Sequence, residues 1–347
     1  MPAPLFLNRV ILRNYRSIAS CDLRLGPVTF LVGPNGSGKS NFLDALRLIS
    51  DALDTSLDHA LRERGGIQEV RRRSSGHPNH FGVRLDFTLP GARTGQFAFE
   101  VAAQARGTFV VKEERCTVDR AAYLVRKGAV QYMTGDIQPP AFPDRLYLVN
   151  AAGLPPFRAV FDALSSMGFY NVSPERIRDL QPPDQGDRLK RDGSNLASVI
   201  EVLERSENAL TRERITDYLA RVVPGVVSFG SKPVGHLETI EFRQEIEGSD
   251  QAWRFPAINM SDGTLRVLAI LAALFQSGVE RRSPLVGLEE PETALHPAAA
   301  GVLRDCILEA SRHVQVLVTS HSADLLDDPR IDHEMLRAVE ATGGRTN

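Results

Sequence analysis

The sequence predicts an α/β fold with a β-rich antiparallel lobe and a helical insertion. A short apolar run over residues 28–32 ends at a glycine-rich turn, and apolar residues at helical spacing follow over 41–49. From residue 259 onward, helix, strand, helix, strand and helix patterns alternate, which is typical of α/β structure. The lobe is indicated by β-like runs separated by Gly, Pro and polar clusters: Val83–Phe87, Gln96–Val101, Thr108–Lys112 and Ala122–Arg126.

A region of helical periodicity follows the predicted lobe. Its apolar spacing predicts helices over 157–168, 195–205 and 211–222, and a hairpin-like stretch follows over 226–246. We therefore expect a small helical insertion between two parts of the α/β core.

Composition limits the classes of protein that the chain can belong to. With 347 residues it is long enough for about two domains, and its formal net charge of −2 excludes a protein that coats nucleic acid. Any nucleic-acid surface must therefore be a local patch. Only five of the 41 basic residues are lysines, so the one lysine that lies in a motif stands out.

Cysteine usage and hydropathy indicate a cytoplasmic protein. The three cysteines (Cys21, Cys116 and Cys306) are widely spaced, which favours neither a disulfide framework nor a zinc site. The N-terminus lacks the pattern of a signal peptide. The most apolar stretch, residues 267–275, is far shorter than the roughly 20 residues that span a bilayer, so no membrane is expected as a partner.

The glycine-rich turn fits the pattern GxxxxGK[ST] over Gly33–Ser40, directly after a predicted strand and before a predicted helix. Glycines let successive backbone N–H groups converge on phosphate oxygens, and the helix that follows adds its positive end. Lys39 would bridge the β- and γ-phosphates, and Ser40 would offer its hydroxyl to Mg²⁺. An accidental match is disfavoured by the strand and helix on either side. The expected nucleotide-binding residues here are Asn35, Gly36, Ser37, Gly38, Lys39, Ser40 and Asn41.

A pair of carboxylates follows the predicted strand 284–288. At the carboxyl end of such a strand, Glu289 could hold Mg²⁺ through water and Glu290 could polarise an attacking water as a general base. A solvated acidic turn is an equal alternative for these two residues taken alone. His321 follows the next predicted strand, 314–318, where a histidine can sense γ-phosphate charge, although a lone loop histidine is more often merely exposed.

Ser261 precedes a helix that is apolar nearly all round, and is expected to cap it. An ordinary helix cap accounts for this residue when it is considered alone.

Taken together, these motifs resemble the ABC-class ATPases of the SMC and RecF type. Within them they resemble the compact AAA-labelled ATP-binding proteins related to OLD (overcoming lysogeny defect) and to phage-defence, or abortive-infection, ATPases. Five segments carry the resemblance: Val10–Ile18 resembles the first strand and its turn, Gly33–Asn41 the Walker A motif, Asn259–Thr264 the signature motif, Leu288–Pro297 the Walker B and D-loop run, and Thr319–Ser322 the switch histidine.

The resemblance implies an ATPase head in three parts. Residues 1–155 are expected to form its N-terminal half with Walker A and the β lobe, 156–223 the helical insertion, and 224–347 its C-terminal half. It further implies Mg-dependent ATP hydrolysis, with Lys39, Glu290 and His321 as catalytic residues.

The resemblance also implies a homodimer that sandwiches two ATP molecules. Ser261 and Gly263 of one subunit would then contact the nucleotide bound to the other. Arg16 is expected near nucleotide phosphate or the base edge. Glu289, Ser40 and Gln68 are the candidates for the Mg²⁺ side of the site, and for Gln68 an exposed loop position is an equal alternative.

The chain departs from the family pattern in its metal-side acid, which is Glu289 rather than the commoner Asp; OLD-like members share this. No coiled-coil heptads separate the motifs, which excludes a long-armed SMC-type tether. The chain ends 26 residues after His321, so we expect either a short variant or a truncated chain, with no room for a nuclease domain.

Two functions remain open at this stage. The first is an ATP-hydrolysing switch or motor that acts in DNA repair or phage defence. The second is a nucleotide-gated scaffold or sensor with little turnover that controls a separate nuclease or toxin effector. A DNA-binding role depends mainly on the basic cluster Arg71–Arg73, for which a solvated loop is the favoured alternative.

Overall fold

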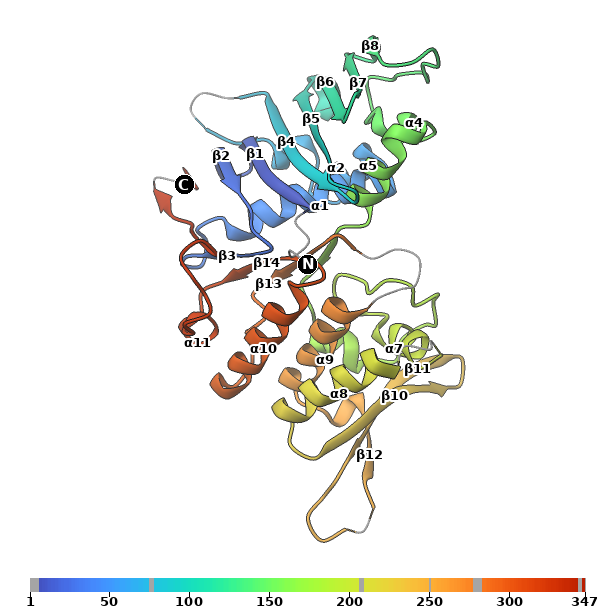
Figure 1. Ribbon diagram of the computed structural model, residues 1–347, viewed down its shortest axis with the longest axis vertical. Helices are drawn as coiled ribbons and strands as arrows, with labels where there is room; N and C mark the ends of the chain where they lie inside the picture. Colours follow the sequence, from blue (N-terminus) through green and yellow to red (C-terminus); the bar gives the residue numbers. More distant parts are fainter. Residues whose placement is uncertain are drawn as a thin grey trace. The chain divides into compact units, whose positions relative to one another are not determined.

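The computed structural model describes residues 6–74, 78–205, 209–249, 251–276, 283–342 and 345–346 (Figure 1). The chain divides into two compact units, and each is described by itself. The N-terminal unit comprises Ala3–Met167, Ser283–Leu285 and Glu334–Asn347. The C-terminal unit comprises Gly168–Arg282 and Val286–His333. The expected division at residues 155 and 223 stays a prediction.

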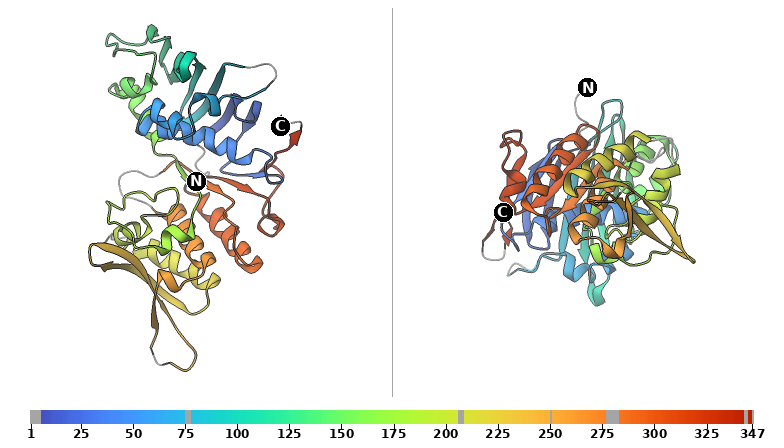
Figure 2. Two further views of the ribbon diagram at one scale, coloured as in Figure 1. Left: turned by 180° about the vertical axis from the view of Figure 1, so that it is seen from behind. Right: turned by 90° about the horizontal axis from the view of Figure 1, so that it is seen from below.

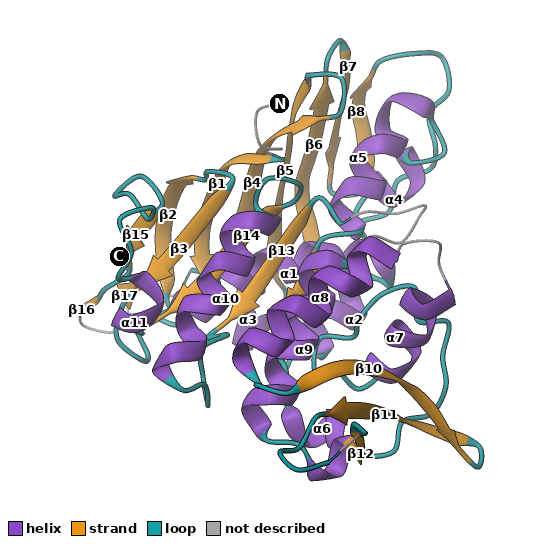
Figure 3. Ribbon diagram, turned by 60° about the horizontal axis from the view of Figure 1, so that its bottom comes forward, coloured by secondary structure: helices purple, strands orange, loops and turns teal. Residues whose placement is uncertain are grey.

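A nine-stranded sheet dominates the N-terminal unit, and its long strands run side by side in Figure 3. Strand β4 alternates buried and half-buried residues along its length, so one face of the sheet carries apolar side chains. Helices α1 (Lys39–Asp54) and α5 (Pro155–Ser165) contact each other and strands of this sheet. In sheet order the strands are β16 (Ala341–Thr342), β17 (Arg345–Thr346), β2 (Ile18–Arg24), β1 (Leu7–Tyr15), β4 (His80–Leu89), β5 (Arg93–Ala103), β6 (Phe109–Val118), β7 (Ala121–Arg126) and β8 (Ala129–Met133).

A second pair of strands in this unit leads into the phosphate loop. Strand β3 (Val28–Val32) pairs in parallel with β15 (Leu336–Ala338), and the loop joins β3 to α1. Three short helices complete the unit: α2 (Leu57–Arg62), α3 (Ile67–Val70) and α4 (Leu148–Ala151).

The C-terminal unit places helices around a small parallel sheet. Strand β13 (Leu285–Glu289) pairs in parallel with β9 (Gly168–Tyr170), and β14 (Gln315–Ser320) is its other neighbour. Helix α9 (Asp262–Phe275) buries nearly every residue from Thr264 onward, because it contacts β9 and its neighbouring helices, among them α8 and α10. The other helices are α6 (Pro174–Arg178), α7 (Leu196–Arg205), α8 (Ala209–Val222), α10 (Pro297–Ala310) and α11 (Ala323–Leu326).

A three-stranded antiparallel sheet packs on the helices of the same unit. Strands β10 (Val226–Val234), β11 (Leu237–Gln244) and β12 (Trp253–Pro256) are visible in yellow and orange in Figure 2. Helices α7 and α8 contact β10, and α7 also contacts β11.

The α/β class and the antiparallel lobe predicted from the sequence are confirmed. The four predicted β runs correspond to β4–β7, which pair antiparallel in sequence order. Several short strands of the described ranges had no pattern strong enough to predict them, among them β8, β9, β12, β15 and β16. No helix of the described ranges has both the length and the apolar character needed to cross a bilayer.

The buried carboxylate of Glu114 links the β lobe to the start of α4 by hydrogen bonds. Glu114 on β6 is fully buried and accepts hydrogen bonds from the Tyr123 hydroxyl at 2.6 Å and from the backbone N–H groups of Tyr147 and Leu148 at 2.6 and 2.8 Å. Burial raises the pKa of Glu114 to about 7, and the three hydrogen bonds offset only part of that rise.

This raised pKa predicts a stability that falls with increasing pH. Between pH 4.5 and about 7 the folded chain holds a proton that the unfolded chain releases, so the free energy of unfolding decreases by up to about 3 kcal/mol across this window. Replacing Glu114 by Gln should remove this contribution, and chemical denaturation of both proteins at several pH values measures it. An unchanged pH slope in the variant would contradict the assignment.

Candidate functional site

The predicted phosphate loop joins β3 to α1 in the N-terminal unit. Gly38 has φ +102°, a left-handed conformation that favours glycine, and a Cβ placed there would lie 2.0 Å from the Thr346 hydroxyl oxygen. The Thr346 hydroxyl also donates a hydrogen bond to the Ser37 carbonyl at 2.8 Å. The close packing of Thr346 therefore requires a glycine at position 38.

The N-terminal end of α1, which is the positive end of the helix dipole, has no capping side chain where it meets the loop. Its first turn holds no acidic residue, and the N-cap residue Gly38 provides no side-chain hydrogen bond. Lys39 is 3% exposed, and its Nζ donates to the carbonyl oxygens of Gly33 and Pro34 at 2.7 and 3.0 Å. A helix end of this kind together with a lysine amine is suited to bind an anion such as phosphate.

Other predicted loop residues lie within or beside this turn. Asn35, Gly36 and Ser40 are exposed, so the Ser40 hydroxyl is open to a ligand. The Ser37 hydroxyl is buried and has no hydrogen-bond partner among the residues that the structure describes. An orphaned hydroxyl inside the turn fits a ligand that supplies acceptor oxygens.

Asn41 supports the phosphate loop through a hydrogen bond to Ser17. Its Nδ2 donates to the Ser17 hydroxyl at 2.6 Å, and the Ser17 and Thr346 hydroxyls lie 2.7 Å apart. The support that Ser17 and Thr346 give to the loop was not predicted, because their contact spans more than 300 positions and leaves no local pattern.

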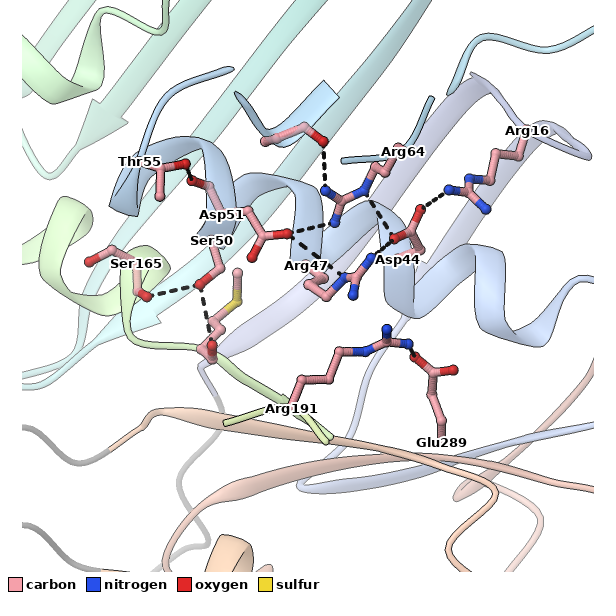
Figure 4. A network of polar contacts seen from close by, with 12 residues as sticks. Arg16, Asp44, Arg47, Ser50, Asp51, Thr55, Arg64, Ser165, Arg191 and Glu289 are labelled. Atoms are coloured by element: carbon pink, nitrogen blue, oxygen red, sulfur yellow. Dashed lines mark hydrogen bonds and ion pairs between the residues drawn. The ribbon is translucent and has the colours of Figure 1, made fainter. Parts of the chain in front are cut away.

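A buried ion network lies on α1 (Figure 4). The Asp44 carboxylate pairs with Arg16, Arg47 and Arg64 at 2.8–3.0 Å, and the Tyr15 hydroxyl donates to it at 2.7 Å. Burial alone would raise the pKa of Asp44, but the three guanidinium groups outweigh it and hold that pKa below its usual range.

Arg16, expected near nucleotide, is engaged in this network. Its guanidinium faces Asp44, and its backbone N–H donates to the Val70 carbonyl at 2.7 Å. Gln68, the weak candidate for the Mg²⁺ side, lies on α3 and accepts a hydrogen bond from Arg71 Nε at 2.6 Å. Both side chains thus have intramolecular partners in the N-terminal unit.

The predicted acidic residues lie in the C-terminal unit, at the carboxyl end of β13. Glu289 is 13% exposed at its side chain, and both of its oxygens have donors: Arg191 Nη2 at 2.7 Å and Asn171 Nδ2 at 3.3 Å. Arg191 was not predicted as part of the site, because it lies in a loop and is one of the many arginines of the chain.

Glu290 and His321 are brought together by β13 and β14. Glu290 has φ +42°, and its backbone N–H donates to the carbonyl and hydroxyl oxygens of Thr319 at 3.0 and 3.1 Å. This backbone turn directs the carboxylate to His321, whose Nδ1 lies 3.6 Å from Glu290 Oε1. A carboxylate held beside an imidazole can serve as a general base.

Glu292 positions the turn that carries His321. Its Oε1 accepts from the Ser320 hydroxyl at 2.6 Å and from the His321 backbone N–H at 3.2 Å, while Oε2 is buried without a hydrogen-bond partner among the described residues. Glu292 lies within the predicted Walker B and D-loop run, but no role in placing the histidine was predicted for it.

Ser261 caps α9 as expected. Its hydroxyl oxygen accepts a hydrogen bond from the Thr264 N–H at 3.2 Å. A Cβ at Gly263 would lie 3.1 Å from the Ala294 carbonyl, so the signature loop packs closely on the turn after β13. Asp262 in the first turn of the helix is paired with Arg178.

Each unit supplies one oxygen donor of the kind that Mg²⁺ prefers. Within the described part of the chain, no group of three or more His, Cys, Asp or Glu side chains could hold a metal ion unaided. Mg²⁺ commonly takes one or two carboxylates plus substrate phosphates. The N-terminal unit offers the exposed Ser40 hydroxyl and the C-terminal unit offers the Glu289 carboxylate, and both are hard oxygen donors that fit this ion.

The fold and these motifs define a P-loop ATPase of the ABC type. The chain belongs to the family described as "AAA domain, putative AbiEii toxin, Type IV TA system", whose model matches residues 28–108 and 155–328. This confirms the predicted relationship to AAA-labelled ATP-binding proteins.

The sequence relatives connect the chain to DNA repair proteins and an OLD nuclease. The DNA replication and repair protein RecF of Magnetococcus marinus is 47% identical over 136 residues, 37% of this chain and 36% of that protein. The RecF of Aliivibrio fischeri is 46% identical over 44 residues, 12% of either chain. The OLD nuclease of Thermus scotoductus is 46% identical over 43 residues, 12% of this chain and 8% of that protein. The chain thus matches at most about a third of the length of these relatives.

Solved SMC heads share the fold over nearly the whole chain. An SMC head bound to the C-winged-helix domain of ScpA has a TM-score of 0.61 at 14% identity, with 99% of this chain and 97% of that chain covered. The Pyrococcus furiosus SMC head with an extended coiled coil, bound to the C-terminal domain of ScpA, also scores 0.61 at 12% identity, with 99% and 95% covered. At these identities the likeness shows the fold alone.

The ion network on α1 predicts a large stability loss when its carboxylate is removed. Replacing Asp44 by Asn removes the carboxylate that three guanidinium groups share and leaves Arg64, whose side chain is 1% exposed, with Asp51 as its counter-charge among the described residues. The substitution should lower the free energy of unfolding by about 3 kcal/mol. Asp58→Asn is the matched control, because Asp58 forms an exposed pair with Arg62 and should cost no more than about 1 kcal/mol. Urea denaturation measures both, and equal losses would show that the network adds nothing to stability.

Proposed function

We propose that the chain binds and hydrolyses ATP in a Mg-dependent manner and dimerises around the nucleotide to drive a DNA-linked or defence process. The observation that carries nucleotide binding is the open, uncapped end of α1 with Lys39 held inside the phosphate loop. Family membership and the SMC-head fold support the same reading.

The proposed chemistry assigns one role to each side chain. Lys39 would leave the carbonyl oxygens of Gly33 and Pro34 for the β- and γ-phosphates, since a phosphate oxygen is the stronger acceptor. Glu290 would accept a proton from the attacking water, and His321 would interact with charge at the γ-phosphate. Bound Mg²⁺, held by Ser40 and Glu289, would neutralise phosphate charge.

The proposed dimer uses Ser261 of one subunit on the nucleotide of the other. Support comes from the cap geometry: the Ser261 oxygen accepts from the Thr264 N–H, and the Ser261 and Thr264 hydroxyls lie 2.8 Å apart. With Thr264 as the donor of the hydroxyl pair, the Ser261 proton would be free to donate to a phosphate oxygen. Arg178 offsets the charge of Asp262, which would otherwise repel an anion at this helix end.

The proposed process follows from the relatives. RecF is a DNA replication and repair protein by its name, and the family description names a toxin of a type IV toxin–antitoxin system. The basic cluster Arg71–Arg73 gives DNA binding limited support, because Arg71 is bonded to Gln68, Arg73 is paired with Glu69 and Arg72 is 8% exposed. Salt-dependent DNA binding that is lost on reversing these charges would establish a DNA role.

The second candidate function is a nucleotide-gated scaffold that turns over little ATP and controls a separate nuclease or toxin effector. The contact of Glu289 with Arg191 favours it, since a metal-side carboxylate occupied by a guanidinium is not yet arranged for hydrolysis.

Replacing Lys39 by Ala should abolish both nucleotide binding and turnover. We expect at least about a hundredfold fall in phosphate release, because the lysine charge is lost at the transferring phosphate. Phosphate release by wild type and variant is measured with and without DNA. Lys112→Ala is the control, since Lys112 pairs with Glu100 on the β lobe and should leave turnover unchanged. Absence of wild-type turnover in every condition would contradict the ATPase.

Replacing Glu290 by Gln separates the two candidate functions. Loss of the general base should slow phosphate release about 10²–10⁴-fold while ATP still binds, so an ATP-bound dimer should accumulate and be detected by light scattering. The exposed Glu334→Gln is the control. An ATP motor would lose its biological activity in the Glu290 variant, whereas a scaffold would keep control of its effector. Unchanged phosphate release would contradict the role of Glu290.

A further inference from the structure

The metal-side carboxylate of the proposed site already has a cationic partner. Arg191 Nη2 lies 2.7 Å from Glu289 Oε1, and Asn171 Nδ2 lies 3.3 Å from Oε2. Figure 4 shows the guanidinium directed at the carboxylate. The Arg191 side chain is 42% exposed and the Glu289 side chain 13% exposed, so water reaches the guanidinium but screens the carboxylate less than it would on the open surface.

The backbone delivers Arg191 to this place. The parallel register of β9 and β13 pairs Tyr170 with Leu288, so the residues that follow, Asn171 and Glu289, are neighbours across the strand pair. The Asn171 N–H then donates to the Arg191 carbonyl at 2.9 Å. Asn171, at the end of β9, therefore contacts Glu289 with its side-chain amide and holds the backbone of Arg191, the guanidinium partner of Glu289.

The loop around Arg191 is braced at further points. The Ser173 N–H donates to the Asp192 carbonyl at 3.0 Å. Asn195, which is 2% exposed, accepts from the Lys190 N–H at 2.7 Å and donates to the Arg188 carbonyl at 2.9 Å. These contacts hold the backbone of the loop that carries Arg191, so the guanidinium starts from an ordered position beside Glu289.

We propose that Arg191 is a positioning residue that competes with Mg²⁺ for Glu289, so that metal-assisted nucleotide binding must first open the ion pair. The inference rests on the proposed function and deepens it. A guanidinium beside the carboxylate repels a second cation that approaches the same oxygens. Arg191 thereby keeps Glu289 ordered in the metal-free protein and raises the Mg²⁺ concentration at which nucleotide is held together with metal.

The test measures nucleotide binding rather than turnover. Calorimetric titration with AMP-PNP, an ATP analogue that is not hydrolysed, is carried out in EDTA and at a series of free Mg²⁺ concentrations. Arg191→Gln removes the competing charge. Lys190→Gln is the matched control, because it removes one positive charge from the same loop while its partner is Asp184. Arg191→Lys keeps the charge.

The expected result is a shift confined to the Mg²⁺ dependence. Arg191→Gln should bind AMP-PNP in EDTA as wild type does, and should need about three- to tenfold less free Mg²⁺ for its half-maximal effect. Lys190→Gln and Arg191→Lys should stay close to wild type.

Several results would overturn the proposal. One is that Arg191→Gln needs as much Mg²⁺ as Lys190→Gln. Another is that Arg191→Gln binds AMP-PNP more weakly than wild type in EDTA, which would assign Arg191 a contact with phosphate instead. Should Arg191→Gln not fold, Arg191→Met is measured in its place, and loss of folding in both with Arg191→Lys intact would make the charge structural. Wild-type binding that is insensitive to Mg²⁺ overturns this inference alone, whereas no AMP-PNP binding by wild type in any condition overturns the proposed function itself.

Discussion

The arrangement of the N-terminal unit depends on the buried charge of Asp44. A carboxylate in this setting is costly unless it is paired, and here it gathers guanidinium groups from three separate segments: the β1–β2 turn, α1 itself and the residues after α2. Since α1 begins at Lys39, the same helix carries the phosphate loop at one end and this network along its side. The Asp44 network thereby connects the β1–β2 turn to the helix that presents Lys39. It supports the phosphate loop through α1, without itself being part of that loop.

The C-terminal unit has several carboxylates in one short segment after β13, and their negative charges would repel one another without suitable partners. Each acidic residue has its own partners: Glu289 faces a guanidinium, Glu290 lies beside the His321 imidazole, and Glu292 is buried and accepts from the hydroxyl and N–H donors at the end of β14. The three carboxylates therefore differ in their hydrogen-bond partners and in their exposure, although they lie within four positions of one another in the chain.

The sequence predicted those parts of the site that are local. The phosphate loop, the carboxylates after β13 and the cap at Ser261 each belong to a short pattern whose strand and helix lie next to it in the chain, and these strands and helices are present in the structure. The antiparallel lobe was predictable for the same reason, since alternating residues separated by turns need no distant partner. By contrast, β9 has only three residues and is defined by its pairing with β13, some 118 positions further on.

Contacts set by tertiary packing could not be predicted in this way. Arg16 was expected to face nucleotide because its turn matches a family motif, yet a motif does not reveal that Asp44 lies beside it. Thr346 and Arg191 reach the loop and the carboxylate from distant segments, and neither lies in a recognisable pattern.

The near-zero net charge of the chain has a structural meaning in this light. Arginines are abundant, but those beside the motifs are used as counter-ions: Arg16 for Asp44, Arg178 for Asp262 and Arg191 for Glu289. A charge that is already paired contributes little to a long-range field that would attract nucleic acid. These ion pairs would nevertheless have to rearrange when a nucleotide binds, because a polyphosphate and its metal ion bring charges of both signs to positions where pairs already exist. Under the proposed function, the cost of rearranging those pairs would therefore contribute to how tightly the chain holds its nucleotide and to the dependence of that binding on ionic conditions.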